Sequence, residues 1–152
     1  MTAARLVASA LGIGFVRTAP GTAGSAAALL LGAVFLAVNP ATIPVAAALA
    51  TLLGLATIPT AIRGSDIKDP GWVVIDEVAG QLLALLPLSR PSPAGLLLAF
   101  AAFRLFDIAK PGPIGWADRQ PGPAGIMADD LHAGLAAAGI VLVGHILGAQ
   151  WV

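Results

Sequence analysis

Long apolar segments, separated by short breaks that contain Pro or Gly, occupy most of this chain of 152 residues. Hydrophobic residues make up 58% of the sequence and charged residues only 11%, whereas soluble domains carry roughly 25% charged residues. The shortage of charge indicates that lipid is the solvent. Helices satisfy their own backbone hydrogen bonds in a bilayer, so the sequence predicts an all-α, polytopic membrane bundle. Its length suits a single domain over residues 1–152.

The apolar runs predict about four to five spanning helices, at residues 26–38, 43–62, 72–88, 94–109 and 126–152. A crossing needs ~20 residues, so the first of these runs must extend into the segment before it. Residues 6–16 are too few to cross and predict a short interfacial or re-entrant helix. Arg17 and Pro20 follow without a small-residue cleavage pattern, so we expect this segment to be retained rather than removed as a signal peptide.

The breaks between the runs predict loops and an orientation. Residues 18–25, TAPGTAGS, and residues 110–125 are rich in Pro and Gly and predict loops, with Ser25 as the N-cap of the next helix. Basic residues concentrate in cytoplasmic loops. A cytoplasmic N-terminus places six basic residues inside and only Arg90 outside; the six are Arg5, Arg17, Arg63, Lys68, Lys110 and Arg119.

Charged residues interrupt three of the apolar runs at similar depth. They are Asp76 and Glu77, Arg104 and Asp107, and the pair Asp129–Asp130, which we expect at the start of the last helix. Each such charge costs about 2.5–3.5 kcal/mol at the centre of a membrane helix, so their recurrence predicts a functional site near the cytoplasmic side. Taken singly, each pair has a structural alternative: solvated acids, an Arg104–Asp107 ion pair, or carboxylates at a helix N-terminus.

The donor chemistry favours a hard cation. The chain has no Cys and two His, and His132 and His145 are expected to serve in packing. Clustered carboxylates without thiolates suit Mg²⁺, which prefers oxygen ligands and shares its coordination shell with substrate phosphates. A divalent ion would also relieve the mutual repulsion of acids in a site of low dielectric constant.

Four sequence blocks occur in an order that resembles the phosphatidylglycerophosphatase A family: APGTAGS, VVIDEVAGQ, FRLFDIAKPGPI and GIMADDLHAG. The resemblance extends from about Gly12 to Gly134 and into the helix that follows. It implies a Mg²⁺-dependent enzyme of the bacterial inner membrane, with its active site facing the cytoplasm. The implied reaction is hydrolysis of phosphatidylglycerophosphate to phosphatidylglycerol and phosphate during phospholipid biosynthesis.

The resemblance also implies site residues. The family's motif acids, as catalytic and metal-binding residues, fall on Asp76, Glu77, Asp107, Asp129 and Asp130. Its motif basic residues, expected to bind the phosphate, fall on Arg104 and Lys110, and we add Thr22 and Ser25 of the APGTAGS block as substrate-binding residues. Both direct attack by water and a covalent route through Thr22, Ser25 or an aspartate remain open, as does the number of metal ions.

Three other classes compete with a lipid phosphatase. A small ion channel or transporter subunit would use intramembrane acids equally well. A phosphotransferase acting on nucleotide-linked lipid alcohols is disfavoured because its usual spaced Asp motif is absent. A purely structural membrane protein would gain nothing from the acids. The expected partners are membrane lipid and the lipid substrate; the net charge of zero gives no basic surface for nucleic acid, and homo-oligomerisation is left open.

Overall fold

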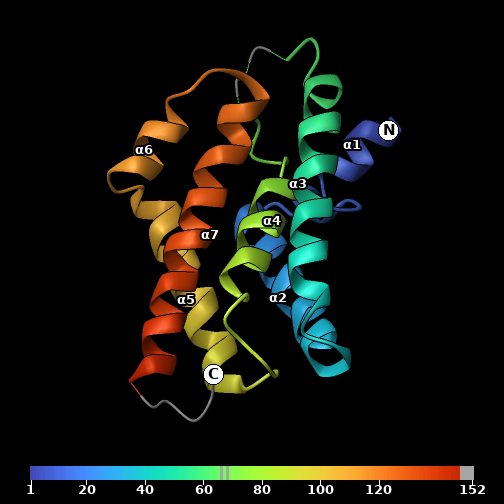
Figure 1. The fold of residues 1–152 in the computed structure, drawn as a ribbon. Coiled ribbons are helices and arrows are strands. Elements are labelled where there is room, and N and C mark those ends of the chain that lie inside the picture. The colour runs from blue at the N-terminus through green and yellow to red at the C-terminus, as the bar shows by residue number, and fades with distance from the viewer. Residues whose placement is uncertain (66, 68, 148–152) are drawn as a thin grey trace.

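The computed structural model describes residues 1–65, 67 and 69–147, and within them every regular element is a helix (Figure 1). The prediction of an all-α bundle is therefore confirmed. The elements are α1 (Ala3–Ala8), a 3₁₀ turn η1 (Ile13–Phe15), α2 (Pro20–Val38), α3 (Thr42–Ala61), α4 (Ile75–Ala84), α5 (Pro93–Ala109), α6 (Pro113–Asp118) and α7 (Gly122–Ile146). The end of the last predicted helix, residues 148–152, lies outside the described residues.

Three helices are long and apolar enough to cross a membrane: α2 with 19 residues, α3 with 20 and α7 with 25. Large apolar side chains on their outer faces are exposed, among them Leu30, Val34 and Leu52. A contiguous apolar exterior of this kind suits lipid contact. The run at 94–109 forms α5, which has 17 residues, while the run at 72–88 forms only the ten-residue α4.

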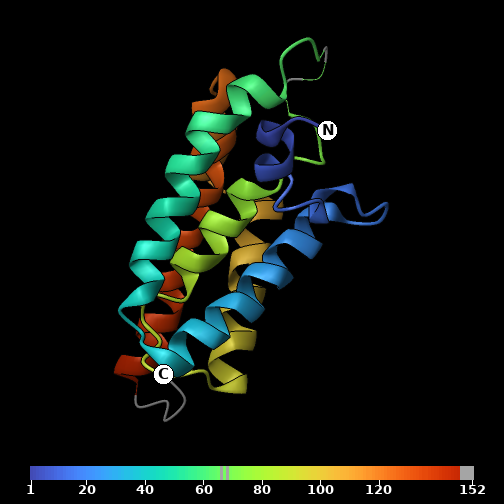
Figure 2. The same ribbon diagram turned by 90° about the vertical axis from the view of Figure 1, so that its right-hand side faces the viewer.

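Helix α4 lies at the centre of the bundle and contacts α2, α3, α5 and α7 (Figure 2). Small residues allow this close packing. A Cβ on Gly80 would lie 2.5 Å from the backbone oxygen of Asp130, and a Cβ on Gly134 would lie 2.3 Å from the backbone oxygen of Gly80. The backbones of α4 and α7 are therefore in direct contact, as is common between membrane helices, and α4 is held at a fixed height beside α7.

The N-terminal segment folds back on the bundle without crossing it. The guanidinium of Arg5 lies 5.5 Å from the ring centroid of Trp72, and Arg5 Nε donates to the backbone oxygen of Ala61 at 3.1 Å. Phe15 stacks on the same Trp72 ring with centroids 5.7 Å apart. These contacts attach the segment to the end of α3 and agree with the prediction of a short helix that does not span.

The segment 18–25 is not the loop that the sequence predicted. Helix α2 begins at Pro20, so Ser25 lies in its second turn and its hydroxyl donates to the backbone oxygen of Gly21 at 2.7 Å. The N-cap prediction for Ser25 is therefore wrong. Proline is favoured at the first position of a helix because its missing N–H has no partner there anyway, and this signal outweighs the two glycines.

The segment 110–125 is also more ordered than predicted, because it contains α6 and the first turn of α7. Asp129 and Asp130 consequently lie about two turns inside α7 and not at its start. Their placement at a helix N-terminus is wrong, and N-terminal capping cannot explain them. Both side chains are buried in the interior of the protein.

Candidate active site

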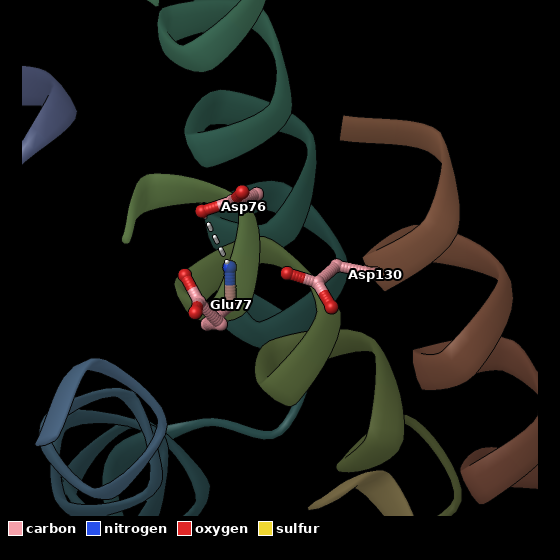
Figure 3. Close-up of side chains that lie close together, drawn as sticks. All are labelled: Asp76, Glu77 and Asp130. Atoms are coloured by element: carbon pink, nitrogen blue, oxygen red, sulfur yellow. Dashed lines mark hydrogen bonds between the residues drawn. The ribbon is translucent and has the colours of Figure 1, made fainter. Parts of the chain in front are cut away.

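Asp76 and Glu77 lie in the first turn of α4. Carboxylates are favoured there because the backbone N–H groups of a first turn point toward them. The carboxylate of Asp76 accepts a hydrogen bond from the Glu77 N–H at 3.1 Å (Figure 3). Because α4 starts in the middle of the bundle, this acidic turn is surrounded by other helices, and Asp76 is only 4% exposed.

Asp130 reaches the same point from α7 (Figure 3). Oxygen atoms from Asp76, Glu77 and Asp130 lie within 4.8 Å of one another. The contact of Gly80 with the Asp130 backbone brings the two helices close enough for this meeting. The three residues, which we call the acidic cluster, come from two of the sequence blocks, and the structure unites them.

The acidic cluster has the properties of a cation site. Glu77 Oε2 and Asp130 Oδ1 are buried and have no hydrogen-bond partner. Unpaired buried carboxylate oxygens are costly, and here they also repel one another. A hard divalent cation would satisfy both the oxygen atoms and the charge, so the acidic cluster could hold a metal ion.

Arg104 and Asp107 of α5 lie beside the acidic cluster. They form the ion pair that their spacing of three residues predicts, and Asp107 is close enough to Asp130 for electrostatic repulsion between the two. Arg104 Nη1 also donates to Ser25 Oγ at 3.4 Å. The pair therefore connects the acids to the start of α2.

The first turn of α2 completes this side of the site. A Cβ on Gly21 would lie 2.2 Å from Glu77 Oε1 and 3.5 Å from Arg104 Nη1, so only glycine allows both side chains to approach the backbone here. Thr22 follows in the same turn and is partly buried. The predicted substrate-binding residues Thr22 and Ser25 thus belong to an element that contacts both Glu77 and Arg104.

Lys110 and Asp129 form a second group. Lys110 Nζ donates to Asp129 Oδ2 at 2.7 Å and pairs with Asp118 of α6. Burial lowers the pKa of Lys110, but its hydrogen bonds to Asp118 and Asp129 outweigh that effect and raise its pKa above the ordinary value of a lysine. Lys110 has a left-handed backbone, with φ of 45°, which ends α5 and turns the chain toward these acids.

The second group borders a cavity of about 210 Å³, which is lined by Asp69, Asp118, Gly125, Ile126 and Asp129. Asp129 and Asp130 are adjacent in sequence, yet only Asp130 joins the acidic cluster. The prediction of a loop at residues 110–125 omits α6 and therefore does not identify Asp118 as a partner of Lys110. The Pro at the first position of the segment PIGWAD is a helix signal. A short helix there places Asp118 at its C-terminal end, where it can turn back toward Lys110.

The sequence is similar to known proteins over nearly its whole length. The sequence profile described as phosphatidylglycerophosphatase A matches residues 6–145. This chain belongs to the phosphatidylglycerophosphatase A family. A phosphatidylglycerophosphatase A of Haemophilus influenzae is 36% identical over 138 residues, which cover 90% of this chain and 85% of the relative. That of Escherichia coli is 32% identical over 147 residues, covering 96% and 84%.

A third relative of this chain has a different name. A Bacteroides thetaiotaomicron protein, provisionally named a phosphatidylinositol-3-phosphatase, is 34% identical over 153 residues, covering 97% of this chain and 93% of the relative. No solved structure matches the chain significantly.

Proposed function

We propose that this protein hydrolyses phosphatidylglycerophosphate to phosphatidylglycerol and inorganic phosphate. The observation that carries the proposal is the acidic cluster of Asp76, Glu77 and Asp130, with Arg104 close to Glu77, in a membrane protein of this family. Acids that hold a cation and basic residues that bind anionic oxygens are the two parts that phosphate ester hydrolysis requires.

The acidic cluster would hold Mg²⁺, with Asp107 and Asp129 close by as further carboxylates. The unpartnered oxygen atoms of Glu77 and Asp130 support this assignment, and the all-oxygen donor set fits Mg²⁺. When bound, Mg²⁺ supplies positive charge that polarises the phosphoryl group and makes water a better nucleophile.

The terminal phosphate of the lipid would bind between the acidic cluster and the basic residues. Arg104, already held by Asp107 and Ser25, offers a planar fork that suits two phosphoryl oxygens. Lys110 adds a second positive charge. The N–H groups of Gly21 and Thr22 lie in the first turn of α2, where backbone donors lack helical partners, and the Thr22 hydroxyl lies in the same turn.

Direct attack by water is the favoured route. A carboxylate near the acidic cluster would accept the proton of the attacking water. Ser25 is a poor nucleophile because its hydroxyl donates to a backbone oxygen and its other partner is Arg104, so no base contacts it. Asp107 and Asp129 are each paired with a basic residue.

The location of the site suits a lipid substrate. We place the protein in the bacterial inner membrane, with α1, the 62–74 connection and the α6–α7 connection on the cytoplasmic side. The acidic cluster lies at the start of α4, in the half of the bundle nearer those connections (Figure 1). A lipid could therefore present its headgroup phosphate to the site while its acyl chains stay in the bilayer.

The proposal is tested by phosphate release from detergent-solubilised protein with phosphatidylglycerophosphate as substrate. We expect release with Mg²⁺ and none with chelator, restored when Mg²⁺ is added back. Asp76→Asn should lower the rate at least about 100-fold, because it removes a metal ligand, while Arg63→Lys, at an exposed position after α3, should keep it. Phosphatidylinositol-3-phosphate serves as the competing substrate. Full activity in chelator would contradict the metal, and preference for the inositol lipid would contradict the substrate.

A further inference from the structure

Gln81 of α4 is a buried polar residue that the proposed chemistry does not yet use. Its side chain is 0% exposed, and neither its amide nitrogen nor its amide oxygen has a hydrogen-bond partner. A buried amide without partners costs free energy that a methionine or leucine of similar size would avoid. Gln81 therefore calls for a functional explanation.

The position of Gln81 connects it with two site residues. It follows Glu77 by four residues and shares its helix face. A Cβ on its neighbour Gly80 would lie 2.6 Å from the ring of Phe103, and Phe103 directly precedes Arg104 in α5. Gln81 is thus one turn from Glu77 and beside the part of α5 that carries Arg104.

The unpartnered atoms of these three residues are complementary. Glu77 Oε2 and Gln81 Oε1 are acceptors, while Gln81 Nε2 and Arg104 Nε are donors, and all four are buried without a partner. An orientation of the Gln81 amide with Nε2 toward Glu77 and Oε1 toward Arg104 would give each of the four atoms a partner. These atoms are four of the six buried side-chain atoms without partners among the described residues.

We propose that Gln81 is a positioning residue that links the Glu77 carboxylate to the Arg104 guanidinium. The link rests on the proposed function, in which Glu77 holds the metal and Arg104 binds the phosphate. By accepting from Nε, Gln81 fixes the plane of the guanidinium, so that its two Nη groups remain directed to Asp107 and the phosphoryl oxygens. By donating to Oε2, it leaves Oε1 of Glu77 for the cation.

Gln81→Met tests the link through activity. We expect kcat/KM to fall about 10- to 100-fold, as for other residues that orient ligands, with a small loss of thermal stability because Glu77 Oε2 and Arg104 Nε lose their partner. In an Arg104→Lys background, which lacks Nε–H, the same change should cost less than about 3-fold, since coupled residues are non-additive. In an Arg63→Lys background the full loss should return. Unchanged kcat/KM, or an equal loss in both backgrounds, would overturn the proposal.

A second measurement needs no substrate. In protein labelled with ¹⁵N-arginine, the Arg104 Nε–H signal is assigned by its loss in Arg104→Lys. We expect this proton to exchange with solvent at least about 10-fold faster in Gln81→Met than in the unaltered protein, and equal exchange would overturn the link. If the unaltered protein releases no phosphate while the exchange rates differ as expected, the proposed function fails and the link stands.

Discussion

Two adjacent aspartates in α7 have different surroundings. Asp130 joins the acidic cluster, whereas Asp129 pairs with Lys110 and borders the cavity that Asp69 and Asp118 also line. Successive residues of a helix point about 100° apart, so the two side chains reach opposite sides of α7's buried face. The pair therefore combines a candidate metal-ligand position, Asp130, with an ion-pair position, Asp129.

This difference predicts that the two aspartates respond differently to Mg²⁺. At a Mg²⁺ concentration about 100 times Kd, the midpoint of thermal unfolding of the unaltered protein should rise by about 5 °C or more. The rise should vanish in Asp130→Asn and persist in Asp129→Asn. In chelator, Asp130→Asn should be at least as stable as the unaltered protein, because one of three mutually repelling carboxylates is neutralised.

Thermal unfolding followed by circular dichroism, with and without Mg²⁺, measures these shifts. Ca²⁺ and Na⁺ at matched ionic strength serve as controls for general salt effects. An equal Mg²⁺ response in both variants would contradict the assignment of Asp130, but not Asp129, to the acidic cluster.

At the level of elements, the site depends on how closely α4 approaches α7. Gly80 and Gly134 place the two backbones in contact, and this contact sets the distance between the first turn of α4 and Asp130. A methyl group at Gly80 would meet the Asp130 backbone oxygen at 2.5 Å, so the helices would have to separate. Separation would also move Asp76 and Glu77 away from Asp130.

Gly80→Ala should therefore destabilise the fold by about 1–3 kcal/mol, which is typical of overpacking in a core, and should weaken the stabilising effect of Mg²⁺. Gly139→Ala is the matched control in α7, because a Cβ there meets no atom within 4 Å and alanine favours the helix by up to about 1 kcal/mol. Thermal unfolding and phosphate release are measured for both. A Gly80→Ala protein as stable and active as Gly139→Ala would contradict the role of this contact.

At the scale of the whole molecule, the connections lie at two opposite ends of the bundle. The α2–α3 turn and the α4–α5 connection lie at one end, and the 62–74 and α6–α7 connections lie at the other (Figure 1). The end with Arg63 and Arg119 is the basic one, while Arg90 lies in the α4–α5 connection. This distribution agrees with the orientation that the positive-inside rule predicts.

The orientation can be measured cleanly because the chain has no cysteine. In intact spheroplasts, Arg90→Cys should react with a membrane-impermeant maleimide, and Arg63→Cys should react only after the membrane is permeabilised. Both residues are exposed in the structure, so access to the reagent and not burial decides the result. The reverse labelling pattern would place the acidic cluster near the wrong leaflet for the proposed reaction.

The sequence by itself determined the helical membrane class and the α3 and α5 segments to within about two residues, and it included Asp76, Glu77 and Asp130 among the acids predicted for the site. Those features follow from local causes: apolar runs of sufficient length and the cost of charge in lipid. The loop predictions at residues 18–25 and 110–125 are wrong because they treat both Gly and Pro as loop signals. In the structure, a proline occupies the first position of α2 and of α6.

Only the tertiary structure decided which acids meet. The sequence left open which of Asp107, Asp129 and Asp130 joins Asp76 and Glu77, and the packing of Gly80 against α7 selects Asp130. Helix α6 supplies Asp118, which holds Lys110 between two carboxylates together with Asp129. The rotation of a helix about its own axis, and so the direction of each side chain, depends on which neighbouring helix each face packs against. That choice is made by contacts between segments far apart in the chain, so spacing along the sequence does not contain it.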